Sequence, residues 1–541
     1  MTEWHDHFFG RKAALELLKK RVLDLKEGYR QNVALLGPRF IGKSSLIQKF
    51  ISDWDDPTTI SVYLNLENKD ISYLYEKLVK SLLFGFTKIK NTPLQEDLTV
   101  LLEETRGALP QTVQVIEHIQ QLLKQKKNSE VYQSLLSLPE IFAVETNLNC
   151  LLFIDEFHCL DNFDLTNPFQ ELGSKIMMHK RCLYVLASSY PEQAKQILSE
   201  KLSLLFGNFE TVLLEPFDSA TSQQLIGQTL HPLRIGMHLK SFLTDFTGGH
   251  PLYLNLITKE LIYLSAFYKQ TEVYVPLVAQ AIDGIIFDSW GVLSRHFELL
   301  VEGLTQGKGM SMTSCLIALA NGKNKVQDLV VESGLRQTQV VQKLNRLVET
   351  DLVEKNGNYF YLKDKLFRYW IKYVLQRRIQ AVELEFGKPG KQFREEIHRV
   401  INEFQMSARK DLPMRVTELF HCFDNESIQL NGRRYKLPIF QEIIPIKMRA
   451  ISGNYFDVIQ AKFDEGTWLV VMKKESMTET DMNTFIQESK KLSPRPQRCV
   501  IVTLSDMDEN TKVRLLQEKM WIWNGQELNT LMHVFDKPYI Q

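Results

Sequence analysis

Short apolar runs alternate with helix-spaced apolar residues along the first 220 positions of the chain. The apolar runs predict strands at 33–36, 60–68, 151–154, 182–190 and 210–218. The run at 151–154 is apolar at every position, which is typical of a parallel strand buried on both faces. Residues 69–146 form one long, mostly helical stretch rich in Leu, Gln and Lys. Strands alternating with helices predict an α/β fold with a three-layer parallel sheet.

The pattern changes between residues 310 and 363. Two short helices are expected at 312–322 and 326–334, and a longer one follows at 336–355. The longer helix has an apolar stripe at helical spacing, made of Val340, Val341, Leu344, Leu347 and Val348. Asn356-Gly357 then predicts the turn of a β-hairpin.

Aromatic residues mark the next helix, at 362–375, and we expect them to pack between domains. The segment 385–392 contains Gly and Pro and predicts a linker. Residues 393–541 have a separate α/β rhythm, which begins with a helix at 393–406 and a polar stretch rich in loops. Two strands joined at Asp464-Glu465-Gly466 follow, and the later elements are a helix at 479–492, a strand at 498–504, a helix at 509–519 and a strand at 520–524.

Length and composition limit the function classes. A chain of 541 residues predicts about three or four domains, and 44% hydrophobic residues with 24% charged residues are ordinary for a globular protein. Lys+Arg and Asp+Glu both number 65, so any nucleic-acid surface must be a local patch. The six cysteines show neither a disulfide framework nor zinc-ligand spacing. The N-terminus lacks the apolar core of a signal peptide, and no apolar run approaches the ~18 residues that span a membrane, so we expect a cytoplasmic protein.

Residues 37–44 match the pattern G-x4-G-K-[ST] between a predicted strand and a predicted helix. Glycines let the backbone N–H groups turn toward phosphates, and the helix N-terminus adds its dipole. The pattern assigns Lys43 to the β- and γ-phosphates of ATP and the Ser44 hydroxyl to Mg²⁺. The residues expected to bind the nucleotide here are Gly37, Pro38, Arg39, Gly42, Lys43, Ser44 and Ser45.

Two acids end the buried strand at 151–154. Asp155 is the candidate Mg²⁺ ligand, and Glu156 is the candidate base that polarises the attacking water. Ligands bind at the carboxyl ends of strands in open α/β sheets, which suits both assignments. The alternative is that the acids cap the following helix. With the phosphate loop, the pair predicts nucleotide hydrolysis through Lys43, Asp155 and Glu156.

Ser188 and Ser189 end the strand at 182–190. A serine there could sense the γ-phosphate, and we include Ser188 among the nucleotide-binding candidates. Strand-end capping by the hydroxyl is an equal alternative.

Four segments in this order resemble the archaeal-type ATPases of the STAND group, which are relatives of the AAA+ ATPases: "FFGRKAALELLKKRV", "GPRFIGKSSL", "LLFIDEF" and "TGGHPLYLNLI". The resemblance covers roughly the first 375 residues. It implies an ATPase domain over 1–218, a helical lid over 219–285 and a winged helix-turn-helix over 286–384. It also places Phe9, Gly10 and Arg11 near the adenine, and Gly249 and Pro251 of the lid near the nucleotide. The structural alternative is that Gly248-Gly249 end one helix and that Pro251 begins the next.

AAA+ relatives complete the site with an arginine from a neighbouring subunit, so the resemblance implies a homo-oligomer. The possible donors are Arg11, Arg39, Lys180 and Arg181. The winged helix could contact double-stranded DNA through the exposed face of its third helix, which carries Arg336, Gln337, Gln339, Lys343 and Arg346. A packing or signalling role for the winged helix is the alternative, since charged outer faces are common.

Family relatives often end in a PD-(D/E)xK nuclease-like domain, which the resemblance places at 393–541. The implied remnant of a metal site is Glu396 (or Glu395), Asp457 and Lys474. Met472 stands where the second carboxylate is expected, and a thioether is a poor ligand for Mg²⁺. Glu475 points to the other face of the strand, and Glu488 is a conceivable migrated acid. We therefore expect a retained fold with impaired or lost cleavage.

The sequence predicts a Mg²⁺-dependent ATP-hydrolysing molecular switch that acts on or with DNA. Two alternatives stay open. One is an active ATP-gated, metal-dependent DNA nuclease. The other is a regulatory scaffold that binds a protein partner and makes no nucleic-acid contact.

Overall fold

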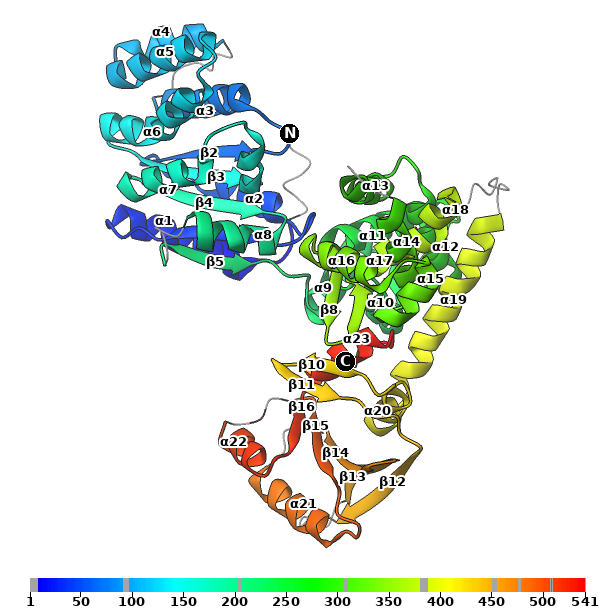
Figure 1. The fold of residues 1–541 in the computed structure, drawn as a ribbon. Helices are drawn as coiled ribbons and strands as arrows, with labels where there is room; N and C mark the ends of the chain where they lie inside the picture. The colour runs from blue at the N-terminus through cyan, green and yellow to red at the C-terminus, as the bar shows by residue number, and fades with distance from the viewer. Residues whose placement is uncertain are drawn as a thin grey trace. The chain divides into compact units, whose positions relative to one another are not determined.

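The computed structural model describes residues 8–90, 97–202, 207–305, 310–379, 388–449, 455–474, 478–505, 507 and 509–540. The described residues fall into two compact units (Figure 1). The first lies within Met1–Thr221 and includes His250–Leu252, and the second lies within Ser222–Gly249 and Tyr253–Gln541. Each unit has its own sheet and core.

The first unit is built on a five-stranded sheet in the order β2-β3-β4-β1-β5, with every pair parallel. Its strands are β1 Asn32–Leu36, β2 Thr59–Asn65, β3 Asn149–Asp155, β4 Cys182–Ser188 and β5 Phe209–Leu213. Helix α1 Lys12–Lys26 precedes the first strand. The helices between the strands are α2 Lys43–Asp53, α3 Ile71–Ile89, α4 Leu98–Arg106, α5 Pro110–Lys124, α6 Asn128–Thr146, α7 Pro168–Met178 and α8 Pro191–Gln196. This arrangement confirms the predicted α/β class.

Helices cover both faces of this sheet, because its central strands alternate apolar side chains between two buried cores. On one face, α1 and α2 pack against Val33, Leu35 and Phe153. On the other, α3, α6 and α7 pack against Leu64, Leu152 and neighbouring strand residues. Strands β1, β3 and β4 are buried almost throughout, as expected for parallel strands between two helical layers.

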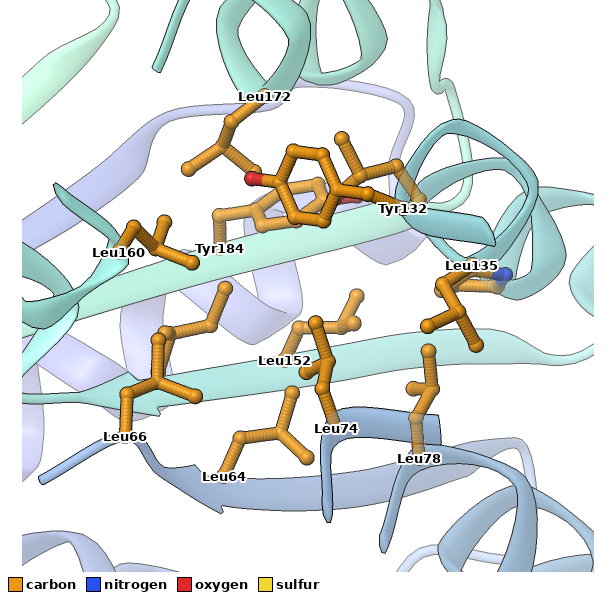
Figure 2. A pocket seen from close by; sticks show the side chains of 13 residues that line it. Leu64, Leu66, Leu74, Leu78, Tyr132, Leu135, Leu152, Leu160, Leu172 and Tyr184 are labelled. Carbon is orange, nitrogen blue, oxygen red and sulfur yellow. The ribbon is translucent and has the colours of Figure 1, made fainter. Parts of the chain in front are cut away.

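The stretch 69–146 forms the four helices α3 to α6 (Figure 1). Figure 2 shows how this insertion meets the sheet: leucines of α3 and Tyr132 of α6 surround a small apolar cavity over β2, β3 and β4. The strand residues lining the cavity include Leu64, Leu152 and Tyr184. The insertion is therefore part of the core of this unit.

The second unit begins with helices and two small strand pairs. The first helices are α9 Ser219–Leu230, which starts in the first unit, α10 Met237–Thr247, α11 Pro251–Phe267, α12 Val275–Phe287 and α13 Val292–Thr305. Strands β6 Arg234–Ile235 and β7 Glu272–Val273 form a parallel pair. The next elements are α14 Met310–Ala320, α15 Val326–Ser333, α16 Gln337–Glu349 and an antiparallel hairpin of β8 Val353–Asn356 and β9 Tyr359–Leu362. Three helices followed by a hairpin is the order predicted for a winged helix.

The C-terminal part contains a mixed five-stranded sheet in the order β12-β13-β14-β15-β16. Its strands are β12 Glu442–Arg449, β13 Tyr455–Phe463, β14 Gly466–Lys473, β15 Arg498–Thr503 and β16 Trp521–Trp523. The first three run antiparallel, and the last two extend the sheet in parallel. One face packs against α20 Leu412–Phe420 and α23 Gly525–Val534, and the other against α21 Glu479–Lys491 and α22 Glu509–Gln517.

Two sequence expectations for this part are wrong. The stretch expected to be rich in loops contains α20, a hairpin of β10 Ser427–Leu430 and β11 Arg433–Lys436, and the edge strand β12. Part of the expected linker is helical, because α19 spans Lys388–Ala408; residues 385–387 lie outside the described residues. Helix α19 packs against α12 and α10, while α20 contacts β13. An aromatic cluster of Phe393 with Tyr369 and Tyr373 holds α19 in place.

The tip of the β8–β9 hairpin presses against β10. A Cβ added at Gly357 would lie 2.1 Å from the carbonyl oxygen of Ser427. The Asn358 backbone N–H donates to that same oxygen at 2.9 Å, and the Gln429 N–H donates to Asn356 Oδ1 at 2.7 Å. Tyr359 is fully buried in the core of the C-terminal sheet. The hairpin is therefore structurally continuous with the C-terminal part.

Among the described residues, no single helix is long and apolar enough to cross a membrane. Helices α12 and α13 reach that length and composition only as a pair, which is bent by 46°.

Replacing Gly357 by Ala should open the hairpin contact with β10. Gly357 has φ +61°, so Ala meets both an unfavourable backbone region and the Ser427 carbonyl. We expect a loss of about 2–4 kcal/mol in the unfolding free energy of the second unit, measured by denaturant titration.

Gly334→Ala is the matched control. Gly334 has nearly the same φ, +65°, but a Cβ there meets nothing within 4 Å. This variant should lose only about 1 kcal/mol. Equal losses in the two variants would show that the hairpin tip is not docked.

Candidate functional site

The loop after β1 has the geometry of a phosphate-binding loop. It runs from Gly37 to Gly42, and α2 begins at Lys43. Gly42 has φ +102°, which favours glycine, and a Cβ at Gly37 would lie 2.6 Å from the Leu214 carbonyl oxygen. Phe40 also adopts a left-handed backbone, with φ +59°. Both glycines of the sequence pattern are therefore required by backbone shape or close packing.

Lys43 lies beneath this loop with only 4% of its surface exposed. Its ammonium donates to the carbonyl oxygens of Gly37 at 2.8 Å and Pro38 at 2.9 Å, and to Ser189 Oγ at 2.8 Å. Burial lowers the Lys43 pKa to about 8, although the nearby carboxylates of Glu156 and Asp155 oppose the shift. A buried cation held by neutral carbonyl oxygens is ready to exchange them for an anion.

Asp155 ends β3 and joins three elements. Its Oδ2 accepts hydrogen bonds from Ser44 Oγ at 2.5 Å and from the Tyr63 hydroxyl at 2.8 Å, and its Oδ1 accepts from the Glu156 N–H at 3.1 Å. The Asp155 side chain is fully buried. Ser44 and Asp155, the two predicted Mg²⁺ ligands, are thus in direct contact.

Glu156 follows in a left-handed conformation, with φ +52°. Its carboxylate accepts a hydrogen bond from the Ser189 N–H at 2.9 Å and another from the Ser189 hydroxyl. Burial raises the pKa of Glu156, while the Ser189 bonds and the Lys43 charge act in the opposite direction. Ser189 therefore fixes the predicted base next to Lys43.

His158 is a close neighbour of Ser188 and Glu156. Its Nδ1 is 3.0 Å from Ser188 Oγ and 3.5 Å from Glu156 Oε2. Burial, aided by the Arg39 charge, lowers the His158 pKa to about 4, so the approach to Glu156 is not an ion pair at neutral pH. Ser188 also accepts a hydrogen bond from the Tyr190 N–H at 3.1 Å. The strand-end capping alternative thus describes Ser188, and Ser189 is the serine that touches Lys43.

The N-terminal box packs against the loop and the end of the sheet. Phe9 meets the Phe217 ring edge-on at 6.0 Å, and the Arg11 guanidinium lies 4.5 Å from the centre of that ring. Arg11 Nη2 also donates to the Ile41 carbonyl oxygen at 3.3 Å. Gly10 has φ +70°, and a Cβ there would meet Phe217 at 3.2 Å.

The residues His250–Leu252 group with the first unit, and one of them contacts the loop. Gly248 and Gly249 follow the last residue of α10 with φ +59° and +72°, and Pro251 starts α11. These residues therefore end one helix and begin the next, as the structural alternative predicts. His250, which groups with the first unit, places its Nε2 3.1 Å from the Arg39 carbonyl oxygen. Sequence reasoning named Gly249 and Pro251 on either side of His250 and missed the histidine itself.

The other predicted residues of the first unit have varied surroundings. Ser45 and Pro38 are exposed. Arg39 pairs with Glu67 at 2.7 Å. The backbone N–H groups of Lys180 and Arg181 donate to Glu140, at 2.9 and 3.1 Å.

The site residues that the sequence did not reveal are Tyr63, Ser189 in its observed role, His158 and His250. All lie outside the phosphate-loop motif and reach the site through the fold, and only Ser189 carried a signal, as a polar strand end.

The residues of the predicted nuclease remnant come from three different elements. Asp457 is exposed and stands opposite Met472 across β13 and β14. Met472 is 3% exposed and belongs to the core of the C-terminal sheet. Lys474 is exposed beyond the end of β14, and Glu475 lies outside the described residues. Glu396 pairs with Arg399 of its own helix, α19.

Nearby acids and lysines are also engaged elsewhere. Lys473, the last residue of β14, pairs with Asp481 at 2.7 Å. Glu488 pairs with Lys491 at 2.6 Å, and Glu395 is exposed on α19. The structure thus places one predicted acid, Asp457, on the sheet and leaves the helix acid Glu396 on α19, which packs against α12 and α10.

The predicted DNA-contact face of α16 is largely exposed. Arg336, Gln337, Gln339 and Arg346 are exposed, and Lys343 is partly buried. The opposite face buries Val340, Leu344 and Leu347. This confirms the amphipathic pattern at those three positions, whereas Val341, which was predicted to belong to the apolar stripe, is exposed.

The residues around the phosphate loop fit a nucleoside triphosphate with Mg²⁺. The Nε atoms of Arg11 and Arg39 are buried without a hydrogen-bond partner among the described residues, which leaves donors unused next to the loop. Lys43, Gly42 and the N-terminus of α2 would hold phosphates, and the oxygens of Ser44 and Asp155 suit a hard cation.

No protein-family model matches the chain, and no curated protein matches it. Its fold is similar to that of a Walker-type ATPase of Pyrococcus abyssi, with 16% identity, coverage of 68% of this chain and 97% of that one, and a TM-score of 0.45. It is also similar to the ORC2 protein of Aeropyrum pernix (12% identity, 70% and 98% coverage, TM-score 0.45). A third structure is the RuvB Holliday junction branch migration motor of Thermotoga maritima (14% identity, 67% and 95% coverage, TM-score 0.35). The fold assignment rests on the strand order and the phosphate loop described above.

Proposed function

We propose that this chain is a Mg²⁺-dependent ATPase that works as a molecular switch. One observation carries the proposal: Lys43, Ser44, Asp155 and Glu156 converge at the carboxyl ends of β1 and β3, each held by partners within the first unit. Phosphate binding alone would require the loop and Lys43. The additional buried Glu156, next to the Mg²⁺-ligand candidates, favours hydrolysis.

Each residue has a distinct task in this proposal. Lys43 binds the β- and γ-phosphate oxygens in place of the Gly37 and Pro38 carbonyls. When bound, Mg²⁺ neutralises charge that develops between the β- and γ-phosphates. Glu156 orients the attacking water and accepts its proton. Ser189 holds the Glu156 carboxylate through a hydrogen bond. Breaking or keeping that hydrogen bond would decide when Glu156 can act as the base.

The switch would be transmitted through the second unit. Asp245 of α10 pairs with Lys365 at 2.9 Å and accepts a hydrogen bond from the Tyr539 N–H at 3.2 Å. The segment that follows α10 includes His250, which reaches the phosphate loop. We therefore extend the proposal to a helical lid whose movement is felt by the C-terminal residues. A homo-oligomer with a shared arginine remains part of this proposal.

We further propose that the exposed face of α16 contacts duplex DNA and that the C-terminal domain is a nuclease fold without cleavage activity. The tip of the hairpin is occupied by β10, so within the described part of the predicted winged helix the exposed face of α16 is the better candidate for DNA contact. Met472 supports loss of cleavage, because a carboxylate at its buried position would cost several kcal/mol.

Lys43→Ala should abolish ATP hydrolysis while the fold is kept. Removing the buried cation takes away a phosphate contact that strengthens as charge develops, so turnover should fall about 100-fold or more. Phosphate release measures the rate, and circular dichroism verifies the fold.

Lys49→Ala is the control on the same helix, since the Lys49 ammonium forms a solvent-exposed pair with Asp53 and has no other partner among the described residues. It should retain normal turnover. Unchanged hydrolysis in Lys43→Ala would refute the proposed site.

A double charge reversal, Arg336→Glu with Arg346→Glu, should weaken binding of the full chain to duplex DNA about tenfold or more at low salt. With ATP and Mg²⁺ or Mn²⁺, the wild-type chain should leave the DNA intact. Gel shift and gel electrophoresis of the same samples provide both readings.

Arg234→Glu with Lys259→Glu is the matched control, because it changes the net charge equally at exposed positions on other elements. If both double variants weaken DNA binding equally, the exposed face of α16 is not the DNA-binding surface. DNA cleavage that disappears in Asp457→Ala would instead establish the active-nuclease alternative.

A further inference from the structure

Three metal-ligating side chains meet at the edge of the first sheet where β3 and β4 begin. They are Glu140, His179 and Cys182, and one ligand atom of each lies within 4.8 Å of the others. Glu140 comes from α6, His179 precedes β4, and Cys182 is the first residue of β4. The cluster lies at the opposite ends of the strands from Asp155 and Ser189, so it is separate from the candidate ATP site.

A fourth donor stands beside them. Cys150 is aligned with Cys182 on the neighbouring strand, in the register of β3 and β4. Cys182 Sγ is 3.4 Å from Glu140 Oε2. Both cysteines are fully buried, and His179 is 4% exposed. One sulfur, one imidazole and one carboxylate are thus gathered at a mostly buried place, and the buried Cys150 thiol is on the adjacent strand.

We propose that Glu140, His179, Cys182 and Cys150 bind one Zn²⁺ ion as a structural site. Zn²⁺ takes four ligands of these types in tetrahedral geometry, and a site closed by four protein ligands has no open position for catalysis. Thiolate sulfur selects against Mg²⁺ and Ca²⁺, which prefer oxygen. On binding, the two cysteine thiols lose their protons to solvent, and both S–Zn bonds form without any redox change.

The surrounding contacts are those that hold ligands in place. His179 Nδ1 is 2.8 Å from the Tyr184 hydroxyl. With Nδ1–H donating to that oxygen, Nε2 is the nitrogen left for the metal. Glu140 accepts the backbone N–H groups of Lys180 and Arg181, which fixes its carboxylate toward the start of β4. Such outer partners orient ligands and raise metal affinity.

The site would fasten the helical insertion to the base of the sheet. Helix α6 contains Pro139, which cannot donate a backbone hydrogen bond, and the Pro139 carbonyl lies 3.6 Å from Cys150 Sγ. A metal bridging Glu140 to β3 and β4 would add a strong link at this weakened turn. Positions 140, 150, 179 and 182 are too widely spaced for a zinc motif, so the fold alone brings them together.

The metal content of the tag-free 541-residue chain tests the proposal. Purified wild-type chain should carry zinc at close to one ion per chain, and Cys182→Ser and His179→Ala should each carry about tenfold less or lower. Metal-stripped wild-type protein loaded with Co²⁺ should develop the intense visible bands of tetrahedral thiolate coordination. This reading needs no variant and holds if a variant fails to fold.

Cys499→Ser, a half-buried cysteine of β15, is the matched control and should keep its zinc. The proposal is overturned if stripped wild-type protein takes up neither Zn²⁺ nor Co²⁺. It is also overturned if Cys182→Ser and His179→Ala keep wild-type metal content, or if mass spectrometry finds a Cys150–Cys182 disulfide in the purified protein. ATP hydrolysis by the same samples is read separately, since the two sites lie at opposite ends of the strands.

Discussion

The buried ammonium of Lys43 is the constraint around which the first unit is organised. A cation with 4% exposure must be met by oxygen atoms, and here two loop carbonyls and Ser189 provide them. Those oxygens come from the ends of β1 and β4, and the carboxylates of β3 lie close enough to oppose the fall in the Lys43 pKa. Three parallel strands therefore have to end together at this point. The same arrangement places Ser44 against Asp155 and Ser189 against Glu156.

Sequence reasoning found the parts of this site that depend on local spacing. The phosphate loop needs glycines at fixed positions between a strand and a helix, and Asp155 and Glu156 follow a run of apolar residues that marks a buried strand. Tyr63, His158 and the observed role of Ser189 were not predicted, because each depends on which strands are neighbours. The strand order β2-β3-β4-β1-β5 brings Tyr63 to Asp155 and Ser189 to Glu156. The pattern of residues along the sequence does not show which strands are neighbours in the sheet or how their residues are aligned.

The same distinction explains the second unit. The amphipathic pattern of α16 and the Asn356-Gly357 turn were readable, since both are local. Strand β12 was missed because its apolar residues are interrupted by Pro445 and bounded by charges, and it is an edge strand paired only with β13. The docking of the hairpin on β10 was also unpredictable, although it decides which surface could meet DNA. Met472 occupies a position where a metal-binding carboxylate was expected, and the structure shows that its side chain packs in the core of the C-terminal sheet.

Glu156 is the residue that separates an ATPase from a protein that only binds nucleotide. The most direct measurement compares ATP affinity and the pH dependence of turnover in the wild-type chain and Glu156→Gln. The account predicts ATP binding within about threefold of wild type and a turnover reduced about 100-fold or more, since a positioned base contributes that much. In the wild type, turnover should fall with decreasing pH as Glu156 is protonated, at a pH above the usual range of a glutamate because burial raises its pKa. Wild-type turnover in Glu156→Gln would contradict the account.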